Sequence, residues 1–183
     1  IPVKTTNIEE FEVSVYRIDL RTVASYGDLF KSLNEYESDS IESFWGEPLG
    51  SRKVSLDSEL NETLSFNLDL QPLLYDIEPG MFVAVFNSKD FDFFRYENRP
   101  TQWFMISDIA VSLYRGDTYT DVFLTSFDTN NSIAKANVDV LAANNKRLFS
   151  GQTDETGRVR IETARLTGSG GLKPELLVAQ TAA

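Results

Sequence analysis

The carboxylates that crowd residues 35–47 are the first candidates for chemistry in this sequence. The segment supplies five of them: Glu35, Glu37, Asp39, Glu42 and Glu47. Two carboxylates held about 5–10 Å apart can cleave a glycosidic bond as acid and base, and a larger group can bind calcium. The sequence has no Asp-x-Asp-x-Asp-Gly loop, and spacing alone does not bring any two of these groups together. The pattern favours a solvated acidic loop, with an enzyme using Asp39 and Glu47 as an alternative hypothesis.

Three shorter motifs also suggest chemistry, and each has a simpler structural explanation. Arg115-Gly116-Asp117 matches the integrin-recognition tripeptide, but Gly and Asp also form turns between strands. The segment from Asp128 to Asp139 repeats part of an EF-hand spacing, but Ile133 stands where that loop requires glycine. The run Gly168-Ser169-Gly170-Gly171 could cradle a phosphate only within a strand–loop–helix unit, which the flanking sequence does not provide. We therefore expect turns and loops at all three places.

The composition excludes several classes of function. The 183 residues contain no cysteine and no histidine, and 28 acidic residues outnumber 17 basic ones, giving a net charge of −11. The chain therefore has no thiolate metal site, no cysteine nucleophile and no Ser-His-Asp triad, and we expect no cofactor. Its acidity argues against partners that are nucleic acids or anionic lipids. No apolar run approaches the ~20 residues of a membrane span, so we expect no insertion of this segment into a membrane.

The charge is distributed unevenly along the chain. Residues 1–100 hold 9 basic and 19 acidic residues, a net of −10, whereas residues 101–183 hold 8 and 9, a net of −1. A polar and aromatic stretch ending at Pro100 lies where this balance changes. The sequence therefore predicts two domains, an acidic one over residues 1–100 and a second one over residues 101–183.

The first half has mostly strand patterns. Residues 11–20 alternate apolar and polar side chains, which is typical of a half-buried strand. Residues 28–36 have apolar residues at helical spacing after a possible cap at Asp28, and predict a short helix. Further strands are expected at 54–56 and 62–68. A Pro-Gly turn then precedes the nearly continuous apolar run of residues 81–86, which predicts a central strand.

The second half has a denser succession of strands and turns. Alternating or apolar segments are separated by turn residues every 8–12 positions, the pattern of an antiparallel sandwich. We expect seven strands, at residues 103–106, 109–114, 121–127, 136–141, 147–152, 158–161 and 175–179.

Aromatic residues gather near the predicted boundary. They are Phe91, Phe93, Phe94, Tyr96 and Trp103. Large aromatic side chains next to a boundary favour packing between neighbouring domains, and we predict that these five form a domain interface. An exposed binding patch is the alternative.

Four ordered sequence blocks in the second half resemble a known family. Residues 103–116 read W-F-M-I-S-D-I-A-V-S-L-Y-R-G, and residues 136–145 read A-N-V-D-V-L-A-A-N-N. Residues 153–159 read T-D-E-T-G-R-V, and residues 168–179 combine G-S-G-G-L-K-P with L-L-V-A. They are similar to the W-x-x-x-S-D-L-x-L-x-x-Y-R-G, A-G-V-x-V-x-L-x-A-R-N-N, T-D-x-x-G-R and G-x-G-G-x-x-P-x-L-L-V-A stretches of bacterial α2-macroglobulins. The first half is similar more loosely, around the strand at Val13 to Ile18.

The resemblance implies an all-β fold. It would consist of two tandem antiparallel seven-stranded macroglobulin β-sandwiches of the immunoglobulin or fibronectin kind, the first with a short helical insertion. Members of the family are large periplasmic proteins, often lipid-anchored to the inner membrane, that trap proteases after cleavage of a bait region exposes a Cys-x-x-Gln thioester. Because this segment has no cysteine, the thioester is expected outside it, as is the bait region.

The function that follows from the resemblance is that of a non-catalytic scaffold. The expected partners are neighbouring macroglobulin domains of the same polypeptide and, for the full-length protein, proteases. The alternative is a stand-alone envelope binding or adhesion module, in which Trp45, Trp103 and the aromatic cluster of residues 91–96 would form an exposed patch.

Overall fold

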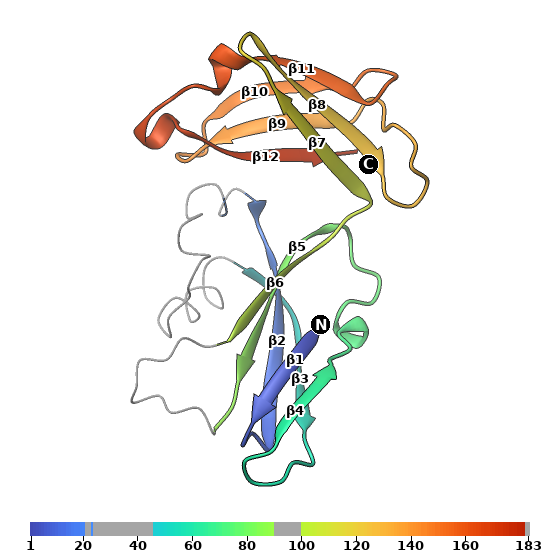
Figure 1. The fold of residues 1–183 in the computed structure, drawn as a ribbon, viewed down its shortest axis with the longest axis vertical. Helices are drawn as coiled ribbons and strands as arrows, with labels where there is room; N and C mark the ends of the chain where they lie inside the picture. The colour runs from blue at the N-terminus through green and yellow to red at the C-terminus, as the bar shows by residue number, and fades with distance from the viewer. Residues whose placement is uncertain (21–22, 24–45, 90–99, 182–183) are drawn as a thin grey trace. The chain divides into compact units, whose positions relative to one another are not determined.

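A computed structural model describes residues 1–20, 23, 46–89 and 100–181 of the chain. It confirms the all-β fold: strands joined by turns and by short 3₁₀ turns make up nearly all of the regular structure (Figure 1). The chain forms two compact units, of which the first ends at Ile106 and the second resumes at Ser107. The domain limits expected from the sequence, residues 1–100 and 101–183, stay a prediction.

The first unit contains a four-stranded antiparallel sheet and a two-stranded one. The larger sheet has the order β3-β2-β5-β6, and the smaller pairs β1 with β4 (Figure 1). The strands are β1 (Pro2–Thr6), β2 (Glu10–Ile18), β3 (Gly46–Ser55), β4 (Thr63–Asn67), β5 (Gly80–Asn87) and β6 (Thr101–Ile106).

The core of the first unit forms on one face of the larger sheet. Val13 and Val15 of β2 share this core with Phe82 and Ala84 of β5, and all four side chains are fully buried. The Phe82 ring also stacks on that of Phe104, with 5.5 Å between centroids. Residues of β5 that face the other way, such as Val83, are buried as well. The apolar run of residues 81–86 therefore forms a strand buried on both faces, as its sequence predicted.

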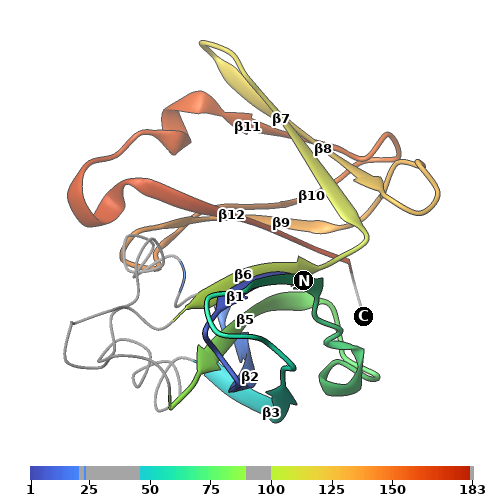
Figure 2. The same ribbon diagram turned by 60° about the horizontal axis from the view of Figure 1, so that its bottom comes forward.

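The second unit is a sandwich of two three-stranded antiparallel sheets. One sheet has the order β11-β8-β7 and the other β10-β9-β12, and Figure 2 shows them as two layers. Apolar side chains from both sheets fill the space between them, including Val122, Leu124, Val138 and Ile161, which are fully buried. The strands are β7 (Ile109–Arg115), β8 (Tyr119–Ser126), β9 (Asn137–Ala142), β10 (Arg147–Gln152), β11 (Arg158–Glu162) and β12 (Pro174–Gln180).

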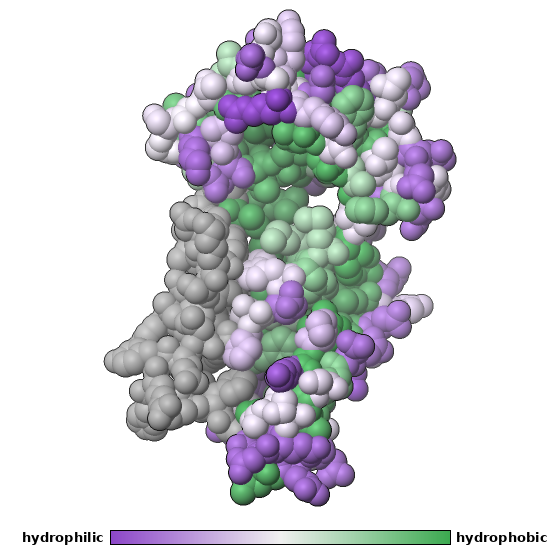
Figure 3. All heavy atoms as spheres, in the orientation of Figure 1, coloured by the Kyte–Doolittle hydropathy of each residue, from purple (hydrophilic) through white to green (hydrophobic). Residues whose placement is uncertain are grey.

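The structure corrects the expected strand count of the second sandwich. All seven strands predicted in residues 101–183 are present, but the first of them, β6, pairs with β5 and extends the sheet of the first unit. Among the described residues, six strands therefore make up the second sandwich, with an isolated bridge between Thr125 and Ser132 in addition. The helical insertion predicted at residues 28–36 lies outside the described residues. Both units expose a mixture of hydrophilic and hydrophobic side chains (Figure 3).

Candidate functional site

Of the five carboxylates proposed for chemistry, four lie outside the described residues: Glu35, Glu37, Asp39 and Glu42. Glu47 is described, and its side chain is exposed on β3, an edge strand of the first unit. In the part of the chain that the structure describes, no three acidic residues gather as a metal site would require. The hypothesis of an enzyme that uses Asp39 and Glu47 gains no support from this position.

Of the five aromatic residues predicted to form a domain interface, only Trp103 lies among the described residues. Phe91, Phe93, Phe94 and Tyr96 lie outside the described residues. Trp103 lies on β6 opposite Val83 of β5, with its side chain partly buried. Because Phe104 next to it joins the core, Trp103 faces the other side of the sheet. Its part in a domain interface stays a prediction.

The block T-D-E-T-G-R at residues 153–158 holds together a turn of the second unit. Thr153 is 3% exposed. Its hydroxyl donates to the Ile133 carbonyl at 2.7 Å and accepts from the Ala136 N–H at 3.0 Å. Asp154 then caps the turn, since its Oδ1 accepts from the N–H groups of Thr156 at 2.8 Å and Arg158 at 3.1 Å. This block therefore fixes the path of the backbone.

The glycine of the same block is required by two features of the turn. Gly157 has φ +74°, in the left-handed region, and a Cβ there would lie 2.5 Å from the Leu124 carbonyl oxygen. The Gly157 carbonyl in turn accepts a hydrogen bond from the Leu124 N–H at 2.8 Å. The backbone of the turn therefore lies in close contact with β8, and only glycine can occupy position 157.

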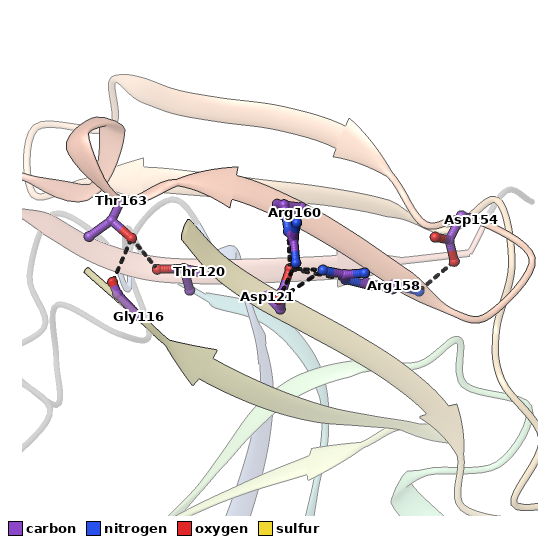
Figure 4. A network of polar contacts seen from close by, with 7 residues as sticks. All are labelled: Gly116, Thr120, Asp121, Asp154, Arg158, Arg160 and Thr163. Atoms are coloured by element: carbon purple, nitrogen blue, oxygen red, sulfur yellow. Dashed lines mark hydrogen bonds and ion pairs between the residues drawn. The ribbon is translucent and has the colours of Figure 1, made fainter. Parts of the chain in front are cut away.

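The arginine of the block belongs to a network of polar contacts, shown in Figure 4. Arg158 donates from Nε and Nη2 to the two carboxylate oxygens of Asp121, both at 3.0 Å. Arg160 binds the same carboxylate in the same way, at 2.9 and 3.1 Å. The two guanidinium groups also lie over aromatic rings, Arg158 over Phe123 and Arg160 over Tyr119. We call Asp121, Arg158 and Arg160 the arginine clamp.

The chemistry of the arginine clamp is structural. Both oxygens of Asp121 accept hydrogen bonds from both arginines, so the carboxylate is held between the two guanidinium groups. The clamp ties β11 to β8 across the outer face of their sheet. Sequence reasoning did not single out Asp121, because its partners are 37 and 39 residues away in the chain.

We expect Asp121→Ala to lower the free energy of unfolding by about 1–2 kcal/mol, because two arginines lose their shared counter-ion at a partly exposed site. Chemical denaturation measures the change. Glu162→Ala is the control: its ion pair with Arg165 is 3.5 Å long and well exposed, and its loss should change stability by less than about 0.5 kcal/mol. Equal effects of the two substitutions would show that the clamp adds nothing.

The tripeptide Arg115-Gly116-Asp117 lies at the turn that joins β7 to β8. The Gly116 N–H donates to the Tyr119 carbonyl at 2.8 Å. The Gly116 carbonyl accepts from the Thr163 hydroxyl at 3.0 Å (Figure 4). The hydroxyls of Thr163 and Thr120 are also 3.2 Å apart and both side chains are buried. The tripeptide is therefore part of a hairpin whose backbone groups are tied to the end of β11, as expected for a turn.

The other two motifs also serve the fold. Asp128 is in a loop after β8, whereas Asp139 lies on β9 in the other sheet, where it pairs with Arg147 at 3.4 Å. The partial EF-hand spacing thus does not gather its ligands. In the glycine run, the Gly171 carbonyl accepts from the Asn144 N–H at 2.9 Å, which joins the last block of the family resemblance to the turn after β9.

The Ser-Asp pair between β6 and β7 forms a further turn. The Ser107 hydroxyl accepts from the Ile109 N–H at 3.0 Å, and Asp108 Oδ1 accepts from the Asp128 N–H at 2.8 Å. The Asp128 N–H, followed by the Ser126 hydroxyl, lowers the pKa of the Asp108 carboxyl below its usual value. These bonds favour the ionised form and join the start of β7 to the end of β8.

Asp108 should make stability depend on pH. A carboxyl whose pKa is lowered on folding stabilises the fold above its unfolded pKa, and this contribution disappears as the pH falls through the folded value. We therefore expect wild type to melt at a higher temperature than Asp108→Asn at pH 7, and the difference to narrow as the pH falls below about 4. Thermal melts of both proteins from pH 7 to pH 3 measure it. A difference that stays constant over this range would contradict the assignment.

Comparison with known proteins identifies the family of the second half of the chain. Residues 106–183 match the family described as the bacterial alpha-2-macroglobulin MG3 domain. Residues 106–183 therefore belong to the bacterial alpha-2-macroglobulin family. No curated protein sequence matches it. All four blocks of the family resemblance fall within or next to this macroglobulin domain, where they form strands and the turns that join them.

Solved structures of Escherichia coli alpha-2-macroglobulin share the fold. One spans the domains named NIE and MG1: it is 22% identical, aligns with 99% of this chain and 83% of its own, and has a TM-score of 0.73. A fragment spanning MG0, NIE and MG1 is 22% identical over 99% of this chain and 55% of its own, with a TM-score of 0.70. The trypsin-activated protein is 23% identical over 98% of this chain, with a TM-score of 0.68. This chain spans only 12% of that last structure.

Proposed function

We propose that this chain is a non-catalytic scaffold segment of a periplasmic alpha-2-macroglobulin that traps proteases. The observation that carries the proposal is the use of the family blocks: Thr153, Asp154, Gly157 and Arg158 all act on the backbone path or on strand pairing. The E. coli protein that shares the fold is described in a trypsin-activated form, which supports a protease as the target of the full-length protein. The bait region and the thioester would then lie in other parts of the polypeptide.

The proposal separates the activity of the segment from that of the full-length protein. Trypsin trapped by the full-length protein should still cleave a small chromogenic peptide but lose its activity on casein, because entrapment excludes large substrates. The isolated 183-residue chain should leave both activities unchanged. Protection of casein by the isolated chain would contradict a purely structural role, and no protection by the full-length protein would contradict protease trapping.

We further propose a periplasmic location, with the full-length protein lipid-anchored to the inner membrane. Among the described residues, none of the helices has the length and apolar character needed to cross a bilayer. Cell fractionation tests this location: the full-length protein should follow inner-membrane markers and be released by detergent. Recovery with cytosolic markers would contradict it.

A further inference from the structure

Strand β7 is an edge strand with an unusual amount of exposed apolar surface. It pairs only with β8 in the described structure, at one end of the order β11-β8-β7. Val111 and Leu113 are 48% and 52% exposed, although they lie opposite Leu124 and Val122, which are fully buried. Their side chains thus point to the inner face of the sheet but extend past the core. In the part of the chain that the structure describes, no further strand follows β7 in this sheet.

The free main-chain groups of β7 belong to these same residues. At the two ends of the hairpin, the Gly116 N–H donates to Tyr119 and the Asp108 carbonyl accepts from Phe127. In an antiparallel ladder, every second residue from such a pair bonds to the partner strand, and the residues between point away from it. Val111 and Leu113 are the residues between. Their N–H and C=O groups therefore point to the open edge.

The other edge strands of this sandwich carry features that prevent pairing with another chain, and β7 does not. On β11 the outward side chains are charged, at Arg158, Arg160 and Glu162. Strands β10 and β12 each have a break in register next to their first residue, which is Arg147 or Pro174. Charges, proline and bulges are the usual protections of sheet edges. Strand β7 pairs without a break in register, and its one charge, Arg115, is its last residue.

We propose that the β7 edge is an interface on which an extended strand from a neighbouring domain of the same polypeptide adds to the sheet. The added strand would exchange main-chain hydrogen bonds with Val111 and Leu113 and place apolar side chains over theirs. This chain spans 12% of the E. coli protein that shares its fold, so a macroglobulin of that size has many further domains that could supply such a strand. The inference rests on the proposed role as a segment of a larger macroglobulin, but not on protease trapping.

Hydrogen–deuterium exchange of the isolated chain and of the full-length protein tests the interface. In the isolated chain, the Val111 and Leu113 amides should exchange within seconds, whereas those of Ser112 and Tyr114, which bond to β8, should be slow. In the full-length protein, the amides of Val111 and Leu113 should exchange at least about 100-fold more slowly. Equal rates in the two proteins would overturn the proposal. So would dimerisation of the isolated chain through β7, measured by sedimentation.

A pair of substitutions separates strand addition from general protection. Leu113→Lys places a charge on the face that the added strand would cover, and should restore fast exchange at Val111 in the full-length protein. Ser112→Lys places the same charge on the opposite face of β7 and should leave that protection intact. Both variants should keep the melting temperature of the isolated chain within about 2 °C, since both side chains are exposed there. Continued protection in Leu113→Lys would overturn strand addition. Loss of protease trapping with β7 still protected would count only against the proposed function.

Discussion

Phe82→Ala is expected to lower the free energy of unfolding of the first unit by about 3–5 kcal/mol, the largest loss for any single substitution considered for this chain. Phe82 is fully buried at the centre of the sheet, and its ring stacks on Phe104. Truncation removes this contact and leaves a cavity between well-packed strands, which cannot close without moving their backbones. Urea denaturation, monitored by hydrogen–deuterium exchange of the β5 amides, measures the loss of stability in this unit.

Phe127→Ala is the matched control, because it removes the same side chain from a site that is 66% exposed. Its effect on the isolated chain should stay within about 0.5 kcal/mol. Comparable losses in the two variants would show that the first unit is not built around Phe82.

Gly157→Ala is expected to cost about 3 kcal/mol in the second unit. About 1–2 kcal/mol comes from the left-handed backbone conformation, which is unfavourable for any residue with a Cβ. The rest comes from the methyl group, which would lie 2.5 Å from the Leu124 carbonyl oxygen and force the turn away from β8. The same movement would shift Arg158, the next residue, from its place in the arginine clamp.

Gly170→Ala separates the two contributions. Gly170 also has a positive φ, +57°, but a Cβ there would have no atom within 4 Å. It should therefore cost only the backbone contribution of about 1–2 kcal/mol. Thermal or urea unfolding of the two variants gives the difference. If Gly157→Ala is no more harmful than Gly170→Ala, the close approach to Leu124 does not constrain the turn.

These substitutions also give physical meaning to the family blocks. The T-D-x-x-G-R block needs its aspartate to cap a turn, its glycine to let two backbones approach and its arginine to pair across strands. Each requirement comes from the fold of a macroglobulin sandwich and none from a reaction. The roles of this block therefore support the proposed scaffold function.

The strands themselves were largely predictable from the sequence. Alternation in residues 11–20 and the apolar run of residues 81–86 depend on the two-residue period of a strand, which is a local property. The turns at Asp154 and Gly157 were predictable for the same reason, since turn residues act on their own backbone. Two strands were missed or shortened. Strand β1 was missed because it is short and polar. The first part of β3 was missed because it contains Pro48 and Gly50, which usually interrupt strands. Both residues are tolerated there because β3 is an edge strand with a break in register.

What the tertiary structure decided is which strands are neighbours. Period-two alternation indicates which face of a strand is buried but not which strand it pairs with. The sequence therefore could not show that β6 pairs with β5, which leaves six described strands in the second sandwich. For the same reason it could not bring Asp121 to Arg158 and Arg160, or leave Val111 and Leu113 at an open edge. Composition and local pattern determined the fold class and excluded cysteine and histidine chemistry. Long-range pairing, whose energy depends on residues far apart in the chain, determined the clamp and the β7 edge.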